Sequence, residues 1–289
     1  MYPASFSYSS PTSLDDALAV LAEHGEDAKL LAGGHSLLPL MKLRFAQPRY
    51  LVDLRRIADL SGIDRSAGEL KIGAMTTYAA LAASDLVRTL VPMLADAAAH
   101  IGDPQVRNRG TIGGSLAHAD PAADLPTVML AAEARMAVVG RRGRRVVPAH
   151  EFFVGMLTTA LAPDEVLAEI LIPLADAREG SAYAKCPHPA SRFALVGVAA
   201  SIRLAANGTV ERARIAVGGM GPMAVRVAGA EAALMGRMPT ADVRHAAAAL
   251  VAAAVDPQED LQGTVAYKRN LALVYGERAL ASAVHRAGG

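Results

Sequence analysis

Residues 29–39 read KLLAGGHSLLP, and residues 106–126 read VRNRGTIGGSLAHADPAADLP. Each stretch contains a pair of glycines that is followed, one or two positions later, by a serine. Because glycine has no Cβ, the backbone N–H groups at such a pair can approach a ligand closely. Two loops of this kind suit a ligand with two phosphates, since each anion needs several donors. The sequence therefore predicts a dinucleotide site.

The two common nucleotide-binding motifs do not match these stretches. A Rossmann loop needs Gly-x-Gly-x-x-Gly and an acidic residue about 20 positions later, whereas residues 33–37 read GGHSL. No Gly-Lys-Ser/Thr follows a glycine-rich stretch, so a P-loop is excluded as well. A single Gly-Gly pair most often marks a tight turn. The second pair, with its own hydroxyl residue, favours a cradle with one loop for each phosphate.

Composition limits the classes of partner. The chain has 289 residues, enough for two domains, and its 29 basic and 28 acidic residues nearly cancel. This balance gives no reason to expect a nucleic acid or an anionic membrane as partner. The basic cluster at residues 141–145 is the exception, and it is interpreted either as a solvated hairpin tip or as a docking patch for an acidic surface.

Cys186 is the only cysteine of the sequence. An internal disulfide is therefore impossible, which fits a reducing cytoplasm. One thiolate is also too few for an iron–sulfur cluster, which usually takes four. The N-terminus lacks the pattern of a signal peptide, and the alanine-rich residues 246–255 are too few to span a bilayer. We expect a cytoplasmic protein without a transmembrane segment.

Apolar periodicity, caps and turn residues predict an α+β chain with two domains. The stretch 175–180 is the expected boundary, and Asn207-Gly208 predicts a hairpin beyond it. A second hairpin is expected around Gly143. We expect helices at residues 12–24, 37–43, 78–83, 86–100, 125–134, 227–236, 241–254 and 265–285. We expect strands at residues 29–31, 50–53, 69–74, 136–140, 144–147, 166–172, 194–204 and 209–217.

The two glycine stretches resemble the FAD loops of the flavoprotein subunits of molybdenum hydroxylases. Residues 29–39 are similar to the first loop, and residues 101–126 to the second. The resemblance is greatest to the medium subunits of aerobic carbon monoxide dehydrogenase-type enzymes, includes the FAD domain of xanthine dehydrogenase-like enzymes, and covers nearly the whole chain. It implies an FAD-binding domain of the vanillyl-alcohol-oxidase type at residues 1–176, with α+β subdomains at about 1–56 and 57–176. Residues 177–289 then form a smaller domain with an antiparallel sheet and helices.

The resemblance also implies which residues bind FAD without a covalent bond. Backbone N–H groups of both loops would hold the pyrophosphate, and Asp124 would accept from ribose or adenine groups. Lys185 would lie near the flavin, where a cation favours the anionic reduced form; from sequence alone it is more often a solvated strand residue. The implied cofactor-binding residues are Leu31, Ala32, Gly33, Gly34, His35, Ser36, Leu37, Ile101, Thr111, Ile112, Gly113, Gly114, Ser115, Asp124, Leu167 and Lys185.

Several of these residues also have a structural interpretation. Asp124 could be the N-cap of the helix that follows it, and core packing explains Ile101 and Leu167 equally well. His35 could be imagined as a covalent flavin attachment point, but a loop-shaping role is favoured.

Other residues outside this set have more than one interpretation. His118 and Asp120 have a spacing that a metal site could use, yet no further ligand is evident, so no metal is expected. Arg107 and Arg109 could face the phosphates, a neighbouring subunit or surface acids. Phe193 stands where many relatives of the carbon monoxide type are expected to have a tyrosine, and Cys186 is interpreted as structural.

On this resemblance the chain is the FAD-binding electron-transfer subunit of a molybdenum hydroxylase. The [2Fe-2S] clusters and the molybdopterin would lie on partners, a small iron–sulfur subunit and a large molybdopterin subunit, assembled as a dimer of heterotrimers. Electrons would pass from the clusters through FAD to an external acceptor, and no side chain is assigned as catalytic. Two alternatives stay open: a stand-alone FAD oxidoreductase with its own substrate, and a noncatalytic nucleotide-binding scaffold.

Overall fold

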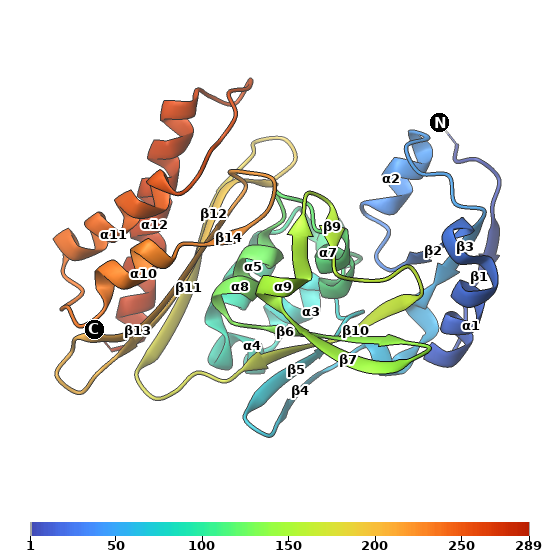
Figure 1. Cartoon of the computed structure of the whole chain (residues 1–289), viewed down its shortest axis with the longest axis horizontal. Coiled ribbons are helices and arrows are strands. Elements are labelled where there is room, and N and C mark those ends of the chain that lie inside the picture. Colours follow the sequence, from blue (N-terminus) through green and yellow to red (C-terminus); the bar gives the residue numbers. More distant parts are fainter. Residues whose placement is uncertain (1, 289) are drawn as a thin grey trace.

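The computed structural model describes residues 2–288, and three sheets follow one another along its long axis (Figure 1). The first is a parallel three-stranded sheet in the order β1-β3-β2, at the N-terminal end. Ser13 caps the helix beside it, whose buried residues Ala17, Leu18 and Leu21 face the sheet. The elements of this lobe are β1 (Ser7–Ser9), α1 (Leu14–His24), η1 (Gly25–Asp27), β2 (Ala28–Leu31), α2 (Leu37–Lys42), β3 (Tyr50–Asp53), η2 (Leu54–Arg56) and η3 (Ala58–Leu60).

The second sheet is antiparallel, has five strands, and lies in the middle of the molecule in the order β4-β5-β10-β6-β7. Its strands are β4 (Ile63–Ser66), β5 (Glu69–Gly73), β6 (Arg135–Gly140), β7 (Gly143–Pro148) and β10 (Glu165–Pro173). The helices that accompany it are α3 (Tyr78–Ala83), α4 (Asp85–Leu90), α5 (Pro92–His100), α6 (Pro104–Arg107), α7 (Ile112–His118), α8 (Asp124–Ala131) and α9 (Ala149–Phe152). A short hairpin of β8 (Phe153–Gly155) and β9 (Thr158–Thr159) completes this part.

The third sheet is antiparallel and is covered on both faces, so the central strand β12 is almost entirely buried. Helices α5 and α8 pack on one side and α12 on the other, as Figure 1 shows. Gly180 of β11 has no room for a side chain, because a Cβ there would stand 2.3 Å from the carbonyl oxygen of Ala283 on α12. The elements are β11 (Glu179–Pro187), β12 (Ala194–Leu204), β13 (Val210–Gly218), β14 (Val225–Arg226), α10 (Ala228–Leu234), α11 (Ala241–Ala253) and α12 (Val265–Arg286).

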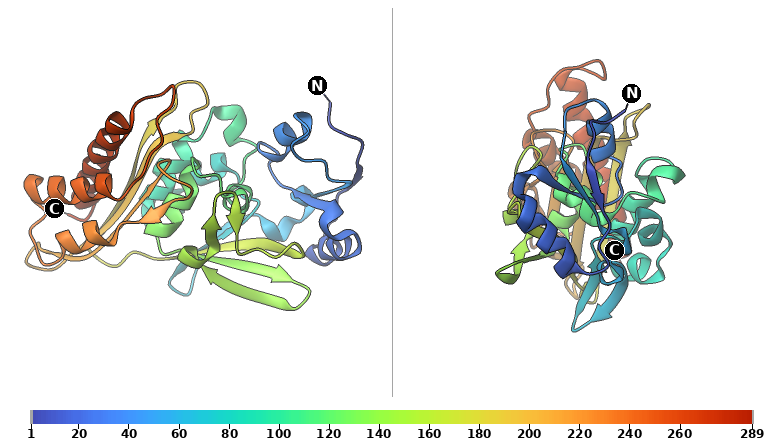
Figure 2. Two further views of the ribbon diagram at one scale, coloured as in Figure 1. Left: turned by 45° about the horizontal axis from the view of Figure 1, so that its top comes forward. Right: turned by 90° about the vertical axis from the view of Figure 1, so that its right-hand side faces the viewer.

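The expected α+β class, with an antiparallel sheet and three helices at the C-terminal end, is confirmed. Both hairpins are confirmed, with Gly143 at a φ of 105° and Gly208 at a φ of 85°. In the left view of Figure 2 the N-terminal lobe and the C-terminal sheet lie at opposite ends of the molecule. No helix within residues 2–288 is both long and apolar enough to cross a membrane.

Two local expectations are wrong. The helix expected at residues 86–100 is two helices, because Pro92 begins α5 and disfavours a helical conformation at Val91, which has φ −140° and ψ 66°. The second glycine pair belongs to the first turn of α7 and not to a loop, with Thr111 as the N-cap.

Candidate cofactor site

A cavity of about 970 Å³ lies where the three parts of the chain meet. This volume is at the upper end of the range of small-molecule sites, roughly 300–1,000 Å³. The segments that line it include the β2–α2 loop, the start of α7, residues 157–159 and 161–163 around β9, the first residues of β10, and the turn 191–193 between β11 and β12. The cavity is therefore built by all three sheets, including the C-terminal one.

The loop after β2 offers a row of free donors. Among residues 2–288, none accepts a hydrogen bond from the backbone N–H groups of Gly33, Gly34, His35 or Ser36. All four residues line the cavity. Gly34 has a φ of +79°, which turns the chain back toward α2, where the N–H of Leu38 donates to the carbonyl oxygen of Gly34. Consecutive unpaired N–H groups form a concave site for an anion.

The second glycine stretch offers different donors from those expected. The N–H groups of Ile112 and Gly113 donate to the carbonyl oxygens of Thr76 and Ala74, at 3.0 and 2.8 Å. Gly114 and Ser115 donate to the Thr111 side chain and carbonyl oxygen. These four N–H groups are thus already paired inside the protein, which corrects the expectation that they hold the pyrophosphate. The Ser115 side chain, which can donate a hydrogen bond, also lines the cavity.

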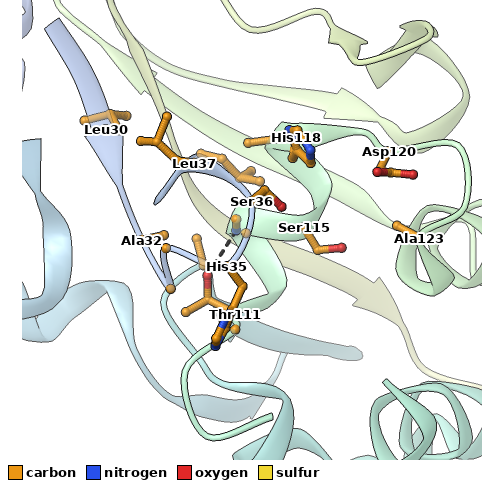
Figure 3. A pocket seen from close by; sticks show the side chains of 18 of the residues that line it. Leu30, Ala32, His35, Ser36, Leu37, Thr111, Ser115, His118, Asp120 and Ala123 are labelled. Carbon is orange, nitrogen blue, oxygen red and sulfur yellow. Dashed lines mark hydrogen bonds between the residues drawn. The ribbon is translucent and has the colours of Figure 1, made fainter. Parts of the chain in front are cut away.

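The two stretches pack directly against each other, as Figure 3 shows for the loop with Ala32 and His35 and the helix start with Thr111. A Cβ on Gly33 would stand 2.3 Å from the carbonyl oxygen of Arg109, and one on Gly114 would stand 3.3 Å from the Cβ of Ala32. A Cβ on Gly113 would stand 2.4 Å from the Cβ of Ala74. These contacts give the glycines a reason beyond ligand access: they allow two backbone segments to form one wall.

Asp124 is buried beside the cavity and is not an N-cap. It is the first residue of α8, where Ala123 is the N-cap and provides no side-chain cap. Its carboxylate accepts hydrogen bonds from the Tyr183 hydroxyl at 2.6 Å and from the Lys185 ammonium at 2.8 Å. Lys185 is therefore no solvated strand residue, because only 4% of its side chain is exposed. Burial raises the pKa of Asp124, while Lys185 and Tyr183 counteract the rise.

The cavity brings together nearly all of the implied cofactor residues. The exceptions are Leu31, Ile112 and Lys185, which lie behind its wall. Leu31 and Ile112 are core residues, and the buried Lys185 contacts the carboxylate of the cavity-lining Asp124. Ile101 and Leu167 both line the cavity and also pack on the core. The pairing of β10 with β6 shifts register just after Leu167, a bulge of the kind that re-aims side chains at sites.

Sequence reasoning missed part of the wall. Tyr78 on α3 lines the cavity, and burial raises its pKa to about 12, so its hydroxyl keeps its proton. Residues 157–159, 161–163 and 191–192 also line it, and no motif in the sequence marks them. Phe193, from the C-terminal part of the chain, contributes a half-exposed ring without a hydroxyl.

The remaining candidates are arginines with partners inside the protein and two residues that could have bound a metal. Arg107 donates to the carbonyl oxygens of Ile101 and Gly102. His118 and Asp120 line the cavity, but within residues 2–288 no three His, Cys, Asp or Glu side chains gather as metal ligands. The Arg145 guanidinium pairs with Glu165, and Arg144 pairs with Glu169.

A large cavity with four free N–H groups, two serine side chains and an apolar wall fits a dinucleotide with two phosphates and a ring system. The comparisons identify the class. The family described as the FAD binding domain in molybdopterin dehydrogenase matches residues 4–175, and the carbon monoxide dehydrogenase flavoprotein C-terminal domain matches residues 181–283.

Similar proteins match over nearly their whole length. The carbon monoxide dehydrogenase medium chain of Hydrogenophaga pseudoflava is 44% identical over 98% of both chains. Subunit alpha of the 6-hydroxypseudooxynicotine dehydrogenase complex of Paenarthrobacter nicotinovorans is 38% identical over 99% of this chain and 97% of its own. A solved structure of the H. pseudoflava carbon monoxide dehydrogenase matches with a TM-score of 0.95 and 46% identity, covering 99% of both chains.

The chain belongs to the family of FAD-binding medium subunits of molybdenum-containing dehydrogenases. It is a flavoprotein of the oxidoreductase class, with an FAD-binding domain followed by a C-terminal antiparallel-sheet domain. The fold class and the cofactor expected from the sequence are thereby confirmed.

Proposed function

We propose that this chain carries electrons through FAD within a molybdenum hydroxylase of several subunits. A small subunit with [2Fe-2S] clusters delivers the electrons, and a large molybdopterin subunit oxidises the substrate. The observation that carries the proposal is the row of free N–H groups at residues 33–36, which faces a cavity large enough for a dinucleotide. Family membership supplies the identity of that dinucleotide.

Each part of the wall has a task in this proposal. The N–H groups of Gly33 to Ser36 bind the pyrophosphate, and the Ser36 and Ser115 hydroxyls add donors. Ile101, Leu167 and Phe193 contact the rings and exclude water from them. The remaining implied residues form or support this wall, with Asp124 at the cavity and Lys185, Leu31 and Ile112 behind it. Bound noncovalently, FAD supplies the exchange between single electrons and electron pairs.

The distribution of metal centres supports the need for partners. The sequence has one cysteine, whereas an iron–sulfur cluster usually takes four thiolates. No cluster of metal-ligating side chains exists in the part of the chain that the structure describes. The clusters and the molybdopterin are therefore assigned to the small and large subunits. We also propose, as the family resemblance implies, that the assembly is a dimer of heterotrimers. The single cysteine also supports a location in the reducing cytoplasm.

The substrate is selected outside this chain. The two relatives named above are 44% and 38% identical to it and carry names with chemically unrelated substrates, carbon monoxide and 6-hydroxypseudooxynicotine. One medium-subunit architecture thus accompanies different oxidations. We assign the substrate pocket to the large subunit and no catalytic side chain to this one.

Reconstitution of the purified full chain with FAD tests the proposal. We expect a flavin spectrum with one FAD per chain, no iron and no molybdenum, and no turnover of organic substrates without partners. Coexpression with the neighbouring subunits should give a complex in which substrate reduces the FAD. A folded chain that does not bind FAD would contradict the cofactor site. Steady turnover by the isolated chain would instead favour a stand-alone oxidoreductase, and an unreduced flavin in the complex a noncatalytic scaffold.

A further inference from the structure

Behind the cavity wall lies a buried polar cluster that joins the two domains. Asp124 belongs to the FAD-binding domain and lines the cavity, whereas Tyr183 and Lys185 belong to β11 of the C-terminal sheet and do not line it. The Asp124 and Lys185 side chains are each 4% exposed, and Tyr183 is 8% exposed. A buried carboxylate of this kind is stable only when its oxygens are paired.

Each oxygen of Asp124 has its own donor. The Tyr183 hydroxyl donates to Oδ1 at 2.6 Å, and the Lys185 ammonium donates to Oδ2 at 2.8 Å. Tyr183 and Lys185 are two positions apart on one strand, so both side chains leave the same face of the sheet. Lys185 Nζ also donates to the carbonyl oxygen of His100, at 3.3 Å, at the end of α5. The carboxylate is thus held in one orientation by the opposite domain.

Two neighbouring positions of the C-terminal sheet beside this cluster are glycines and have no side chain. Gly197 on β12 pairs with Lys185, and a Cβ on Gly197 would stand 2.0 Å from the Tyr183 hydroxyl oxygen. Gly218 on β13 pairs with Gly197, and a Cβ there would stand 2.2 Å from Oγ1 of Thr127 on α8. A side chain at position 197 would occupy the space of the phenol hydroxyl. The hydrogen bond to Asp124 therefore depends on glycine at this position.

We propose that Tyr183 and Lys185 are positioning residues that keep Asp124 as a fixed, ionised carboxylate at the FAD cavity, with Gly197 making room for Tyr183. This inference rests on the proposed binding of FAD in the cavity. It assigns a role at the cofactor to Tyr183 and Gly197, which no sequence motif marks. In this inference Lys185 does not contact the cofactor but contacts Asp124, which compensates its charge.

The charges around Asp124 determine what loss of the Tyr183 hydroxyl does. Burial raises the pKa of Asp124, and the two donors from β11 oppose this. The pKa of Tyr183 lies well above its ordinary value because of burial and the nearby carboxylate. Tyr78 and His100 also face Asp124, from α3 and α5, and the Asp96–Arg286 pair lies at the backbone of Tyr183.

Without the hydroxyl, Asp124 binds a proton at higher pH and becomes neutral. The Lys185 ammonium then has no compensating charge near the cavity. A positive charge near FAD favours the electron-rich reduced cofactor. The reduction potential of the bound FAD should therefore rise, relative to the wild type, as the pH falls through the new pKa of Asp124.

The variant Tyr183→Phe tests this in the full chain, because it removes one oxygen and keeps the ring. The control is Tyr8→Phe, which removes a hydrogen bond of the same kind, from the Tyr8 hydroxyl to Oδ2 of the buried Asp53 at 2.8 Å, outside the cavity wall. We expect the Asp124 carboxyl, followed by ¹³C NMR without FAD, to titrate at higher pH in Tyr183→Phe and at the wild-type pH in Tyr8→Phe.

With FAD bound, spectroelectrochemistry should show a more positive potential at acidic pH for Tyr183→Phe alone. Adding Asp124→Asn to this variant should remove the extra pH dependence. If Tyr183→Phe changes neither the titration of the Asp124 carboxyl nor the reduction potential of bound FAD, the inference is overturned. If Tyr183→Phe does not fold, Asp124→Asn alone should raise the potential at pH values where the wild-type Asp124 is ionised, and a wild-type potential there would overturn the inference. A wild-type chain that binds no FAD contradicts the proposed function instead, while the NMR titration still tests the cluster.

Discussion

Gly33 illustrates how a single residue can serve both the fold and the site. Its missing side chain lets the β2–α2 loop contact the backbone of Arg109 and Gly110, on the segment that leads into α7. The same contact places the free N–H groups of residues 33–36 along the cavity. The sequence predicts that Gly33 lets a ligand approach the backbone. The structure shows that Gly33 also lets the two backbone segments touch.

We therefore expect Gly33→Ala to weaken FAD binding. The new Cβ would stand 2.3 Å from a carbonyl oxygen and 2.8 Å from a Cα, and both atoms are backbone, so the two segments must separate. Overpacking of this kind typically costs about 1–3 kcal/mol, and a loss of about 1.4 kcal/mol in binding corresponds to roughly tenfold in Kd. Fluorescence quenching titrations with FAD and thermal unfolding measure the two effects.

The matched control is Gly229→Ala. A Cβ on Gly229 of α10 has no neighbour within 4 Å. Alanine should stabilise this helix by about 0.5–1 kcal/mol and leave FAD binding unchanged. Wild-type affinity for FAD in Gly33→Ala would show that the contact between the segments does not set the geometry of the site.

At the scale of elements, the β6–β7 hairpin supports the segment that lines the cavity beside β9. The Arg145 guanidinium donates to both oxygens of Glu165, at 2.7 and 2.6 Å, and to the carbonyl oxygen of Ala160 at 2.7 Å. Glu165 in turn accepts from the N–H of Ala162 at 2.8 Å. Arg144, which precedes Arg145 in the sequence, pairs with Glu169 on β10. The two adjacent arginines thus differ in whether they hold the segment 157–163.

Arg145→Gln should weaken FAD binding a few-fold, with a loss of stability of about 1 kcal/mol, whereas Arg144→Gln should leave binding unchanged. Arg145 lowers the pKa of Glu165. The pair therefore stabilises the folded chain above the ordinary glutamate pKa, and this stabilisation is lost as the pH falls through the lowered value. The difference in unfolding free energy between wild type and Arg145→Gln should be largest near neutral pH and vanish in acid. Equal FAD affinity in both variants would contradict the assignment.

Elements with a local signal could be predicted, and those that depend on distant contacts could not. Asn207-Gly208 marks the β12–β13 hairpin, and Ser13 marks the start of α1. By contrast, Gly113 and Gly114 lie inside α7 against the low helix propensity of glycine, because Gly113 packs on Ala74 of a distant segment. The single helix expected at residues 86–100 overlooked an available signal, Pro92.

In the candidate site, too, residues with a local sequence signal could be predicted and those that depend on distant contacts could not. The two glycine stretches supply many, though fewer than half, of the cavity-lining residues. Tyr183 was missed, because its partner Asp124 is 59 positions away and nothing local marks the pair. Lys185 was expected at the flavin and lies behind Asp124. Burial and charge pairing across domains decide such positions, and neither is visible in one sequence.

At the scale of the whole molecule, the FAD-binding domain depends on the C-terminal sheet. Every residue of α8 is buried, and this helix packs on β12 and β13. The turn that carries Phe193 closes the cavity from the same side. Arg286 at the end of α12 adds a charged contact across the boundary, to Asp96 of α5 at 2.6 Å. The cofactor site is therefore completed by a sheet that follows it in the sequence.

A divided chain tests this dependence and the proposed boundary between residues 176 and 177. The cut lies in an exposed segment between β10 and β11, so it breaks no element. Residues 1–176 alone should expose the apolar face of α8, bind a hydrophobic dye and retain no FAD, because Asp124 loses both of its donors. Coexpressed with residues 177–289, the fragment should copurify with it and recover FAD, since burial of α8 drives association. Retention of FAD by residues 1–176 alone, at the affinity of the intact chain, would show that the first domain forms the site independently.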